Sequence, residues 1–224
     1  MDHNPAGRSA HREAARLRRP RPGPILGWAV GGLATGALAH PSLAVPGAVG
    51  GALLGGWLHV RAAGAAAGRW SAGAAGEEAT ERLLAPLAEQ GWVLLHDRAI
   101  PGSDANLDHL VVSRAGSVAV VDSKRWGRGA AVRAVRGRLY CGPQDRDRQV
   151  RVLEWEAQHV ARTLGVPVTP LMVVHGARVA GRRFRVGGVV VVAPEQLLPV
   201  LRSLPAVGHP GAASAAAIAY PPYR

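Results

Sequence analysis

The first third of the chain is apolar and lacks the regular alternation of a surface helix or strand. Residues 24–60 contain no Asp, Glu, Lys or Arg, and Ala39-His40-Pro41-Ser42 divides them into two runs, 24–39 and 43–60. Each run is near the short limit of the about 17–25 residues that a helix needs to span a bilayer. The pattern therefore predicts a transmembrane helical hairpin over residues 24–61, in contact with membrane lipid.

The flanks of this segment set its expected orientation. Residues 1–23 are polar and arginine-rich and predict a basic, disordered arm, while Arg61 follows the second apolar run. Arginines at both outer ends and an uncharged turn favour a bacterial cell membrane location with both ends in the cytoplasm. Glycines recur four residues apart, as at Gly27 and Gly31, which lets helices approach closely within one chain or between chains of an oligomer.

Two other interpretations of the apolar segment stay open. A basic start, an apolar run and the small residues of Ala37-Leu38-Ala39 also describe a cleaved signal peptide. A buried hairpin of a soluble protein is disfavoured by the glycine-rich, charge-free composition. A mature chain that began near His40 would contradict the membrane hairpin.

From residue 74 the apolar spacing becomes that of a mixed domain, after a small-residue linker at 62–73. Apolar periods predict helices at 77–90, 147–164 and 194–204, and strands at 92–95, 166–174 and 187–192. Alternation predicts a β-hairpin over 108–112 and 117–122, and a further strand or hairpin over 131–140. This order predicts an α/β fold, a mixed β-sheet flanked by helices, over residues 74–206. The Pro- and Ala-rich residues 207–224 predict a flexible tail.

Charge points to an anionic partner. Lys+Arg number 27 against 15 Asp+Glu, a formal net charge of +12, so nucleic acid or anionic lipid is the expected partner. Hydrophobic residues make up 48% and exclude a wholly disordered chain. The single cysteine, Cys141, excludes an internal disulfide and a thiolate zinc site. Aromatics at 4% disfavour an RNA-binding sheet built on stacking.

Four residues in the mixed domain carry candidate chemistry. Asp122 and Lys124 are two apart at a strand end and share a sheet face, and the hairpin brings Asp108 opposite residues 121–122. Glu77, on a helix packed against the sheet, adds a third carboxylate. Hard oxygen ligands of this kind suit Mg²⁺ or Mn²⁺, and a lysine beside them stabilises charge on a phosphate. Taken singly, each residue also has a structural explanation as a helix-start acid, a turn residue or a cross-turn ion pair.

Lys124 is also the only lysine, because 26 of the 27 basic residues are arginine. A lysine kept in an arginine-biased chain indicates a site that needs a compact ammonium, although chance survival of one codon gives the same count. An acid-free stretch follows it, with Arg125, Arg128, Arg133, Arg136 and Arg138. These side chains either follow a nucleic-acid backbone or lie on a solvated loop.

The string Gly76-Glu77, Pro101-Gly102-Ser103, Ala105-Asn106-Leu107-Asp108-His109-Leu110-Val111-Val112 and Val120-Val121-Asp122-Ser123-Lys124 resembles the nuclease-related domain (NERD) family. That family is assigned to the restriction-endonuclease-like PD-(D/E)xK superfamily. The resemblance implies that Asp108 and Asp122 ligate Mg²⁺ (or Mn²⁺), that Glu77 completes the metal shell, and that Lys124 positions water or stabilises the transition state. It also implies a helix-borne polar residue facing the site, for which Gln149 is the candidate. The acid before Lys124 is Asp, and no proline directly precedes Asp108.

The predicted function is a membrane-anchored, metal-dependent nuclease that hydrolyses DNA or RNA, with DNA favoured. The alternative is a non-catalytic, membrane-tethered nucleic-acid-binding or scaffold module with the same fold. The sequence contains no His-x-x-x-His pair, nucleophile elbow or Gly-x-x-x-x-Gly-Lys loop, so zinc hydrolysis, serine hydrolysis and a nucleotide-driven motor have no support.

Overall fold

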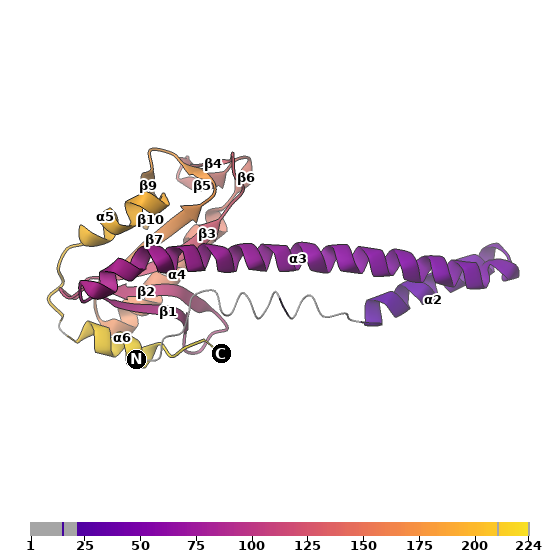
Figure 1. Cartoon of the computed structure of the whole chain (residues 1–224), viewed down its shortest axis with the longest axis horizontal. Coiled ribbons are helices and arrows are strands. Elements are labelled where there is room, and N and C mark those ends of the chain that lie inside the picture. Colours follow the sequence, from indigo (N-terminus) through magenta and orange to yellow (C-terminus); the bar gives the residue numbers. More distant parts are fainter. Residues whose placement is uncertain (1–14, 16–21, 210, 224) are drawn as a thin grey trace. The chain divides into compact units, whose positions relative to one another are not determined.

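A computed structural model describes residues 15, 22–209 and 211–223 of the chain. Apart from residues 15, 22 and 23, the predicted basic arm at 1–23 lies outside the described residues. The contacts divide the chain into two compact units, one at residues 10–71 and one that contains residues 72–224. Figure 1 labels the elements of both units, each of which is described by itself below.

The first unit contains helix α2, a short 3-10 turn and the first part of helix α3, whose last residues belong to the second unit. Helix α2 covers Pro22–Ala39, the turn η1 covers Pro41–Leu43, and helix α3 covers Ala44–Glu89. The helices touch through glycine: a Cβ on Gly32 would lie 2.1 Å from the Gly47 carbonyl oxygen, and one on Gly51 2.3 Å from the Trp28 carbonyl oxygen. Only glycine permits this approach, as expected from the four-residue glycine spacing.

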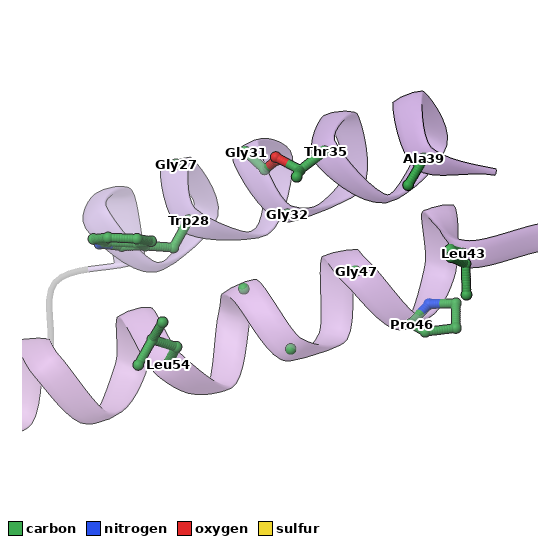
Figure 2. A pocket seen from close by; sticks show the side chains of 12 residues that line it. Gly27, Trp28, Gly31, Gly32, Thr35, Ala39, Leu43, Pro46, Gly47 and Leu54 are labelled. Atoms are coloured by element: carbon green, nitrogen blue, oxygen red, sulfur yellow. The ribbon is translucent and has the colours of Figure 1, made fainter. Parts of the chain in front are cut away.

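Large apolar side chains of this unit face outward. Leu33, Leu53 and Trp57 are all exposed, and a groove of about 850 Å³ with apolar walls opens between α2 and the start of α3 (Figure 2). Among the described residues one segment, Pro41–Ala62, is long and apolar enough to cross a membrane, and only 6% of it is buried. The apolar part of α2, Leu26–Ala39, is shorter. The structure thus gives one long apolar helix, and a spanning hairpin stays a prediction.

Residues 62–73, which were expected to form a small-residue linker, are helical and lie within α3, and the boundary between the two units falls at residues 71–72. Alanine has the highest helix propensity; half of residues 62–73 are alanine and none is proline, so this segment continues a helix despite its three glycines. As a result Glu77 lies well inside a 46-residue helix and not at a helix start.

The second unit is a mixed α/β domain, as predicted, built on a six-stranded sheet. Its strand order is β1-β2-β3-β7-β10-β9, with β3 parallel to β7 and β7 parallel to β10. The strands are β1 Val93–Ala99, β2 Asn106–Val112, β3 Val118–Arg125, β7 Val168–His175, β9 Arg183–Val186 and β10 Val189–Val192. The predicted hairpin is present: β2 and β3 pair antiparallel, with Val112 opposite Val118.

Helices cover both faces of this sheet. One face packs on α4, Asp147–Leu164, and α6, Ala212–Ala219, through a core that includes Val120, Met172 and Leu153. The other face packs on the end of α3 and on α5, Leu197–Arg202, which follows the 3-10 turn η2, Pro194–Gln196. Alternation along β3 therefore sends Val118, Val120, Asp122 and Lys124 toward α4, and Ala119, Val121 and Ser123 toward α3.

A second, smaller sheet follows β3 along the chain. Its order is β6-β5-β4-β8, with β4 Ala131–Val135, β5 Arg138–Cys141, β6 Gln144–Asp145 and β8 Arg178–Val179. The two-residue turn Arg136-Gly137 joins β4 to β5 with positive φ at both positions, 49° and 75°. That geometry matches the right-handed twist of the strands and confirms a hairpin within residues 131–140.

Residues 207–224, which were expected to form a flexible tail, contain a packed helix and a segment bonded to β1. The helix is α6, whose Ala212 and Ala216 are fully buried, and the chain continues along the edge of β1. The Ala99 amide donates to the Pro221 carbonyl at 2.9 Å, and the Tyr223 amide to the Asp97 carbonyl at 2.9 Å. An alanine-rich helix buries its small face against α4, so a composition that suggests a loose tail instead covers a strand edge.

Candidate nuclease site

The β2–β3 hairpin brings three of the predicted residues to one place. His109 pairs with Val121, so Asp108 comes level with Asp122, and Lys124 lies two residues further along the same face of β3. The Lys124 ammonium donates to Asp122 Oδ1. The backbone amide of Ser123 donates to Asp108 Oδ2 at 2.8 Å, which fixes that carboxylate against the end of β3.

Helix α4 supplies the opposite wall of the site. A cavity of about 190 Å³ is lined by Asp122 and Lys124 from β3 and by Arg148, Gln149 and Val152 from α4. Gln149 therefore faces the site as the family resemblance implied. Arg148, which the sequence analysis did not single out, places a cation at the same opening.

Glu156 is a second residue that the sequence analysis missed. It is buried on the inner face of α4, seven residues after Gln149, and its charge acts on both Asp122 and Lys124. Two turns of helix return a side chain to nearly the same face. The spacing of Gln149, Leu153 and Glu156 thus indicated that the three side chains lie on one face of the helix. A glutamate on an amphipathic helix is nevertheless expected to face solvent as long as the position of the helix on the sheet is unknown.

Burial and mutual repulsion dominate the electrostatics of these acids. Burial, followed by the charges of Glu77 and Asp122, raises the pKa of Asp108 well above its usual range. Burial and the charge of Asp122 raise the pKa of Glu156 to about 8. Burial lowers the pKa of Lys124, but the neighbouring carboxylates outweigh it, so the net shift is upward and the lysine stays an ammonium. The site is an acidic cluster around one fixed cation.

Glu77 approaches from the other helix. It lies on α3, is buried, and is close enough that its charge raises the pKa of Asp108. Gly76, the residue before it, brings α3 near the end of β3: a Cβ on Gly76 would lie 3.3 Å from the Arg125 Cβ. Glu77 therefore belongs to the same electrostatic cluster as Asp108.

The carboxylate oxygens of the site are the kind of ligand that a hard divalent cation prefers. Asp122 Oδ2 is buried and accepts no hydrogen bond from the residues that the structure describes, which leaves a carboxylate oxygen in need of a cation. An added positive charge lowers the raised pKa values of neighbouring acids, because it stabilises their ionised forms. The described side chains do not by themselves form a group of three or more acids, histidines or cysteines in metal-binding geometry. The fit therefore rests on oxygen chemistry and on the unsatisfied Asp122 oxygen.

The opposite face of the same hairpin carries a chain of hydrogen-bonded polar side chains. His96 Nδ1 and His109 Nδ1 lie 2.7 Å apart, and His109 Nε2 lies 3.1 Å from Ser123 Oγ. Ser123 Oγ donates to Thr80 Oγ1 of α3 at 2.8 Å. Thr80 Oγ1 lies 2.8 Å from His175 Nε2 and donates to the Gly76 carbonyl at 3.1 Å. All five side chains are buried.

Counting the available protons shows which group donates in each of these hydrogen bonds. Each hydroxyl has one proton, which Ser123 gives to Thr80 and Thr80 gives to Gly76, so Nε2 of His109 and Nε2 of His175 must both donate. Burial and the neighbouring histidine charges lower the pKa of His109, and burial with Arg125 and Arg82 lowers the pKa of His175. A neutral His109 protonated at Nε2 then accepts at Nδ1 from His96.

The five arginines that were expected to bind nucleic acid are all exposed. Arg125 ends β3, Arg128 lies in the β3–β4 connection, and Arg133, Arg136 and Arg138 lie on the β4–β5 hairpin. Arg138 also donates to Asp145 Oδ2 at 2.5 Å. Trp126, between Arg125 and the hairpin, is partly buried, and the Arg146 guanidinium lies 5.3 Å from its ring centre.

The fold and the site define a class: a mixed α/β domain with acids and one lysine at the ends of paired strands. Residues 72–175 match the family model of the nuclease-related domain. The chain thus carries a nuclease-related (NERD) domain, which confirms the resemblance seen in the sequence. Comparison with curated proteins and with solved structures found no significant match.

Proposed function

We propose that the protein is a membrane-anchored, Mg²⁺- or Mn²⁺-dependent nuclease with a restriction-endonuclease-like catalytic domain. The observation that carries this proposal is the convergence of Asp108, Asp122 and Lys124 on one sheet face, with Gln149 of α4 lining the same cavity as Asp122 and Lys124. It is supported by the nuclease-related domain at residues 72–175.

In this proposal each residue has a separate task. Asp108 and Asp122, with Glu77 beside them, would hold the metal ion, which when bound polarises the scissile phosphate and lowers the pKa of the attacking water. Lys124, kept protonated by its acidic neighbours, stabilises charge that builds on the phosphate oxygens. Gln149 donates or accepts through its amide and orients the phosphate or the water in the cavity. The charge of Glu156, buried on α4, also favours the protonated form of Lys124.

The membrane part of the proposal rests on the apolar first unit. Its outward-facing leucine and tryptophan side chains need an apolar solvent, and the helix over Pro41–Ala62 is long enough to supply one span. We propose that α2 supplies the second, with both ends in the cytoplasm. Carbonate-resistant membrane retention of a chain that keeps its first 39 residues is the expected result. A mature chain starting near His40 would contradict the hairpin.

The activity test uses the full chain in non-ionic detergent. Plasmid, linear single-stranded DNA and RNA are each incubated with Mg²⁺, Mn²⁺ or EDTA, beside Asp122→Asn and its matched control Asp104→Asn on an exposed loop. We expect metal-dependent cutting, of DNA above RNA, that Asp122→Asn loses and Asp104→Asn keeps. Binding without cutting under every metal would instead support a tethered nucleic-acid-binding module.

A further inference from the structure

The small sheet has one face in the core and one face in solvent. Val132, Leu139, Cys141 and Val179 are buried in the core cluster that also contains α4. Because side chains alternate along a strand, the residues between them point outward. The outward side chains include Arg133 on β4, Arg138 on β5 and Arg178 on β8, all exposed.

Strand register sets these arginines side by side. Ala131 pairs with Arg178 across the parallel β4–β8 ladder, and Arg133 lies two residues further along the same face of β4. Arg133 in turn pairs with the half-buried Tyr140 of β5. Neighbouring strands lie about 4.8 Å apart, so three adjacent strands carry guanidinium groups within reach of one extended strand of ligand. Arg136, in the β4–β5 turn, extends the row. We call Arg133, Arg136, Arg138 and Arg178 the basic face.

Most of the charge on the basic face is not neutralised by the protein. Asp145 is the acid on the same face of the sheet, and it is already paired with Arg138. Within the described part of the chain Arg133, Arg136 and Arg178 make no ion pair and no side-chain hydrogen bond. Unpaired guanidinium groups on an exposed sheet face fit a row of phosphate oxygens.

The basic face is continuous with the candidate nuclease site. The Arg138 Nε lies 3.8 Å from Oδ2 of Asp147, which is the first residue of α4. The next two residues of that helix, Arg148 and Gln149, line the cavity that holds Asp122 and Lys124. A strand leaving the cavity past the start of α4 therefore meets the basic face next.

We infer that the basic face binds the phosphate backbone of the substrate nucleic acid outside the cleavage site. This inference rests on the proposed nuclease function and adds a residue, Arg178, that comes from a distant part of the chain. Its contacts are to phosphates and carry no base specificity, so their contribution is measured by the salt dependence of binding.

The experiment measures binding without cleavage, with the full chain in non-ionic detergent and EDTA. Fluorescence anisotropy of a labelled duplex and a labelled single strand is followed through a KCl series for wild type and for Arg133→Gln/Arg178→Gln. The matched control, Arg114→Gln/Arg202→Gln, removes the same charge near the opposite end of the β2–β3 hairpin, where Arg202 contacts Gln90 at the end of α3. We expect the face variant to lower the slope of log K against log salt by about 1–2 and the control to leave it unchanged.

Three results would overturn the inference. An unchanged slope in the face variant, or an equal loss in the control, would show that the face makes no specific phosphate contact. A face variant that lost binding to phosphatidylglycerol vesicles but kept its nucleic-acid slope would assign the face to lipid. A parallel cleavage assay with Mg²⁺ separates the two proposals: cutting with an unchanged slope rejects only the basic face, whereas a lowered slope without cutting rejects only the nuclease.

Discussion

The two faces of the β2–β3 hairpin carry polar groups of opposite character. The face under α4 holds Asp108, Asp122 and Lys124, with an excess of acid and an unsatisfied oxygen on Asp122. The face under α3 holds His109 and Ser123, neutral and hydrogen-bonded in a closed chain. The same two strands build both environments, because neighbouring residues of a strand point to opposite faces of the sheet.

The two faces differ in their expected roles: reactivity belongs to the charged face and stability to the neutral face. A buried polar chain in which every donor has an acceptor fixes the packing of α3 on the sheet. A cluster of buried acids around one ammonium weakens folding unless a cation compensates it, because each carboxylate raises the cost of its neighbours. We therefore propose the charged face as the ligand-binding face, whereas the neutral face stabilises the packing of α3 on the sheet. The amide of Ser123, which binds Asp108, connects the two.

The largest expected effect is on the charged face. Asp122→Asn keeps the shape of the side chain but removes the charge that would hold a metal ion, and we expect at least about a 10³-fold loss of cleavage. Nucleic-acid binding in EDTA should stay the same or become tighter, because one negative charge near the phosphates is removed. Initial rates on plasmid and anisotropy on an oligonucleotide measure both. Wild-type activity in this variant would remove the proposed metal role.

Lys124→Arg tests whether the site needs an ammonium or only a positive charge. A planar guanidinium is longer and cannot take the place of the ammonium beside Asp122 Oδ1, so we expect a loss of cleavage of about 10²–10³-fold. Arg125→Lys, at the next and exposed position, should change the rate little. Full activity of Lys124→Arg would show that the survival of a single lysine has no functional meaning.

Thr80→Val tests the neutral face. The variant keeps the shape of threonine but leaves the Ser123 hydroxyl and His175 Nε2 without their shared acceptor, at an expected cost of about 2–4 kcal/mol in the free energy of unfolding. Thr80→Ser keeps the hydroxyl and should cost under about 1 kcal/mol. Urea unfolding followed by tryptophan fluorescence provides the comparison. Equal stabilities of the two variants would mean that the hydrogen bonds contribute nothing beyond packing.

The smallest expected effect is a pH dependence of the neutral face. Burial, with Arg125 and Arg82 nearby, lowers the pKa of His175 in the folded state, so below the ordinary value of about 6.5 the unfolded chain takes up a proton that the folded one refuses. The stability that His175 contributes is complete above that pH and falls as the pH drops. The difference in unfolding free energy between wild type and His175→Gln should shrink from pH 6.5 downward. A difference that widens there contradicts a neutral His175.

Local periodicity was sufficient for most of the fold. The helix at 147–164 and the β2–β3 hairpin follow from apolar spacing alone, because α4 has one apolar face and the hairpin strands alternate. The two segments whose helical state was not expected, 62–73 and 207–224, share a cause. Alanine-rich segments have no apolar period to read, so their helical state depends on propensity and on a surface against which to pack.

The part of the candidate site that depends on strand geometry was predictable from the sequence. The part that depends on where helix α4 lies on the sheet was not. The i, i+2 rule put Asp122 and Lys124 on one face, and the hairpin register brought Asp108 level with them. Glu156 and Arg148 were missed because the sequence does not say which turn of α4 lies over the end of β3. The pairing of β4 with β8, which adds Arg178 to the basic face, joins residues too far apart in sequence for any local pattern to reveal.

The central claim is that the charged face of the hairpin performs metal-dependent phosphodiester hydrolysis. The most direct test compares the full chain with Lys124→Ala on plasmid, single-stranded DNA and RNA, with Mg²⁺, Mn²⁺ or EDTA. Cutting that requires the metal and disappears in Lys124→Ala is the predicted result. Wild-type protein that binds nucleic acid but cuts none of these substrates under any metal would contradict the claim, as would a Lys124→Ala variant that cuts as fast as wild type.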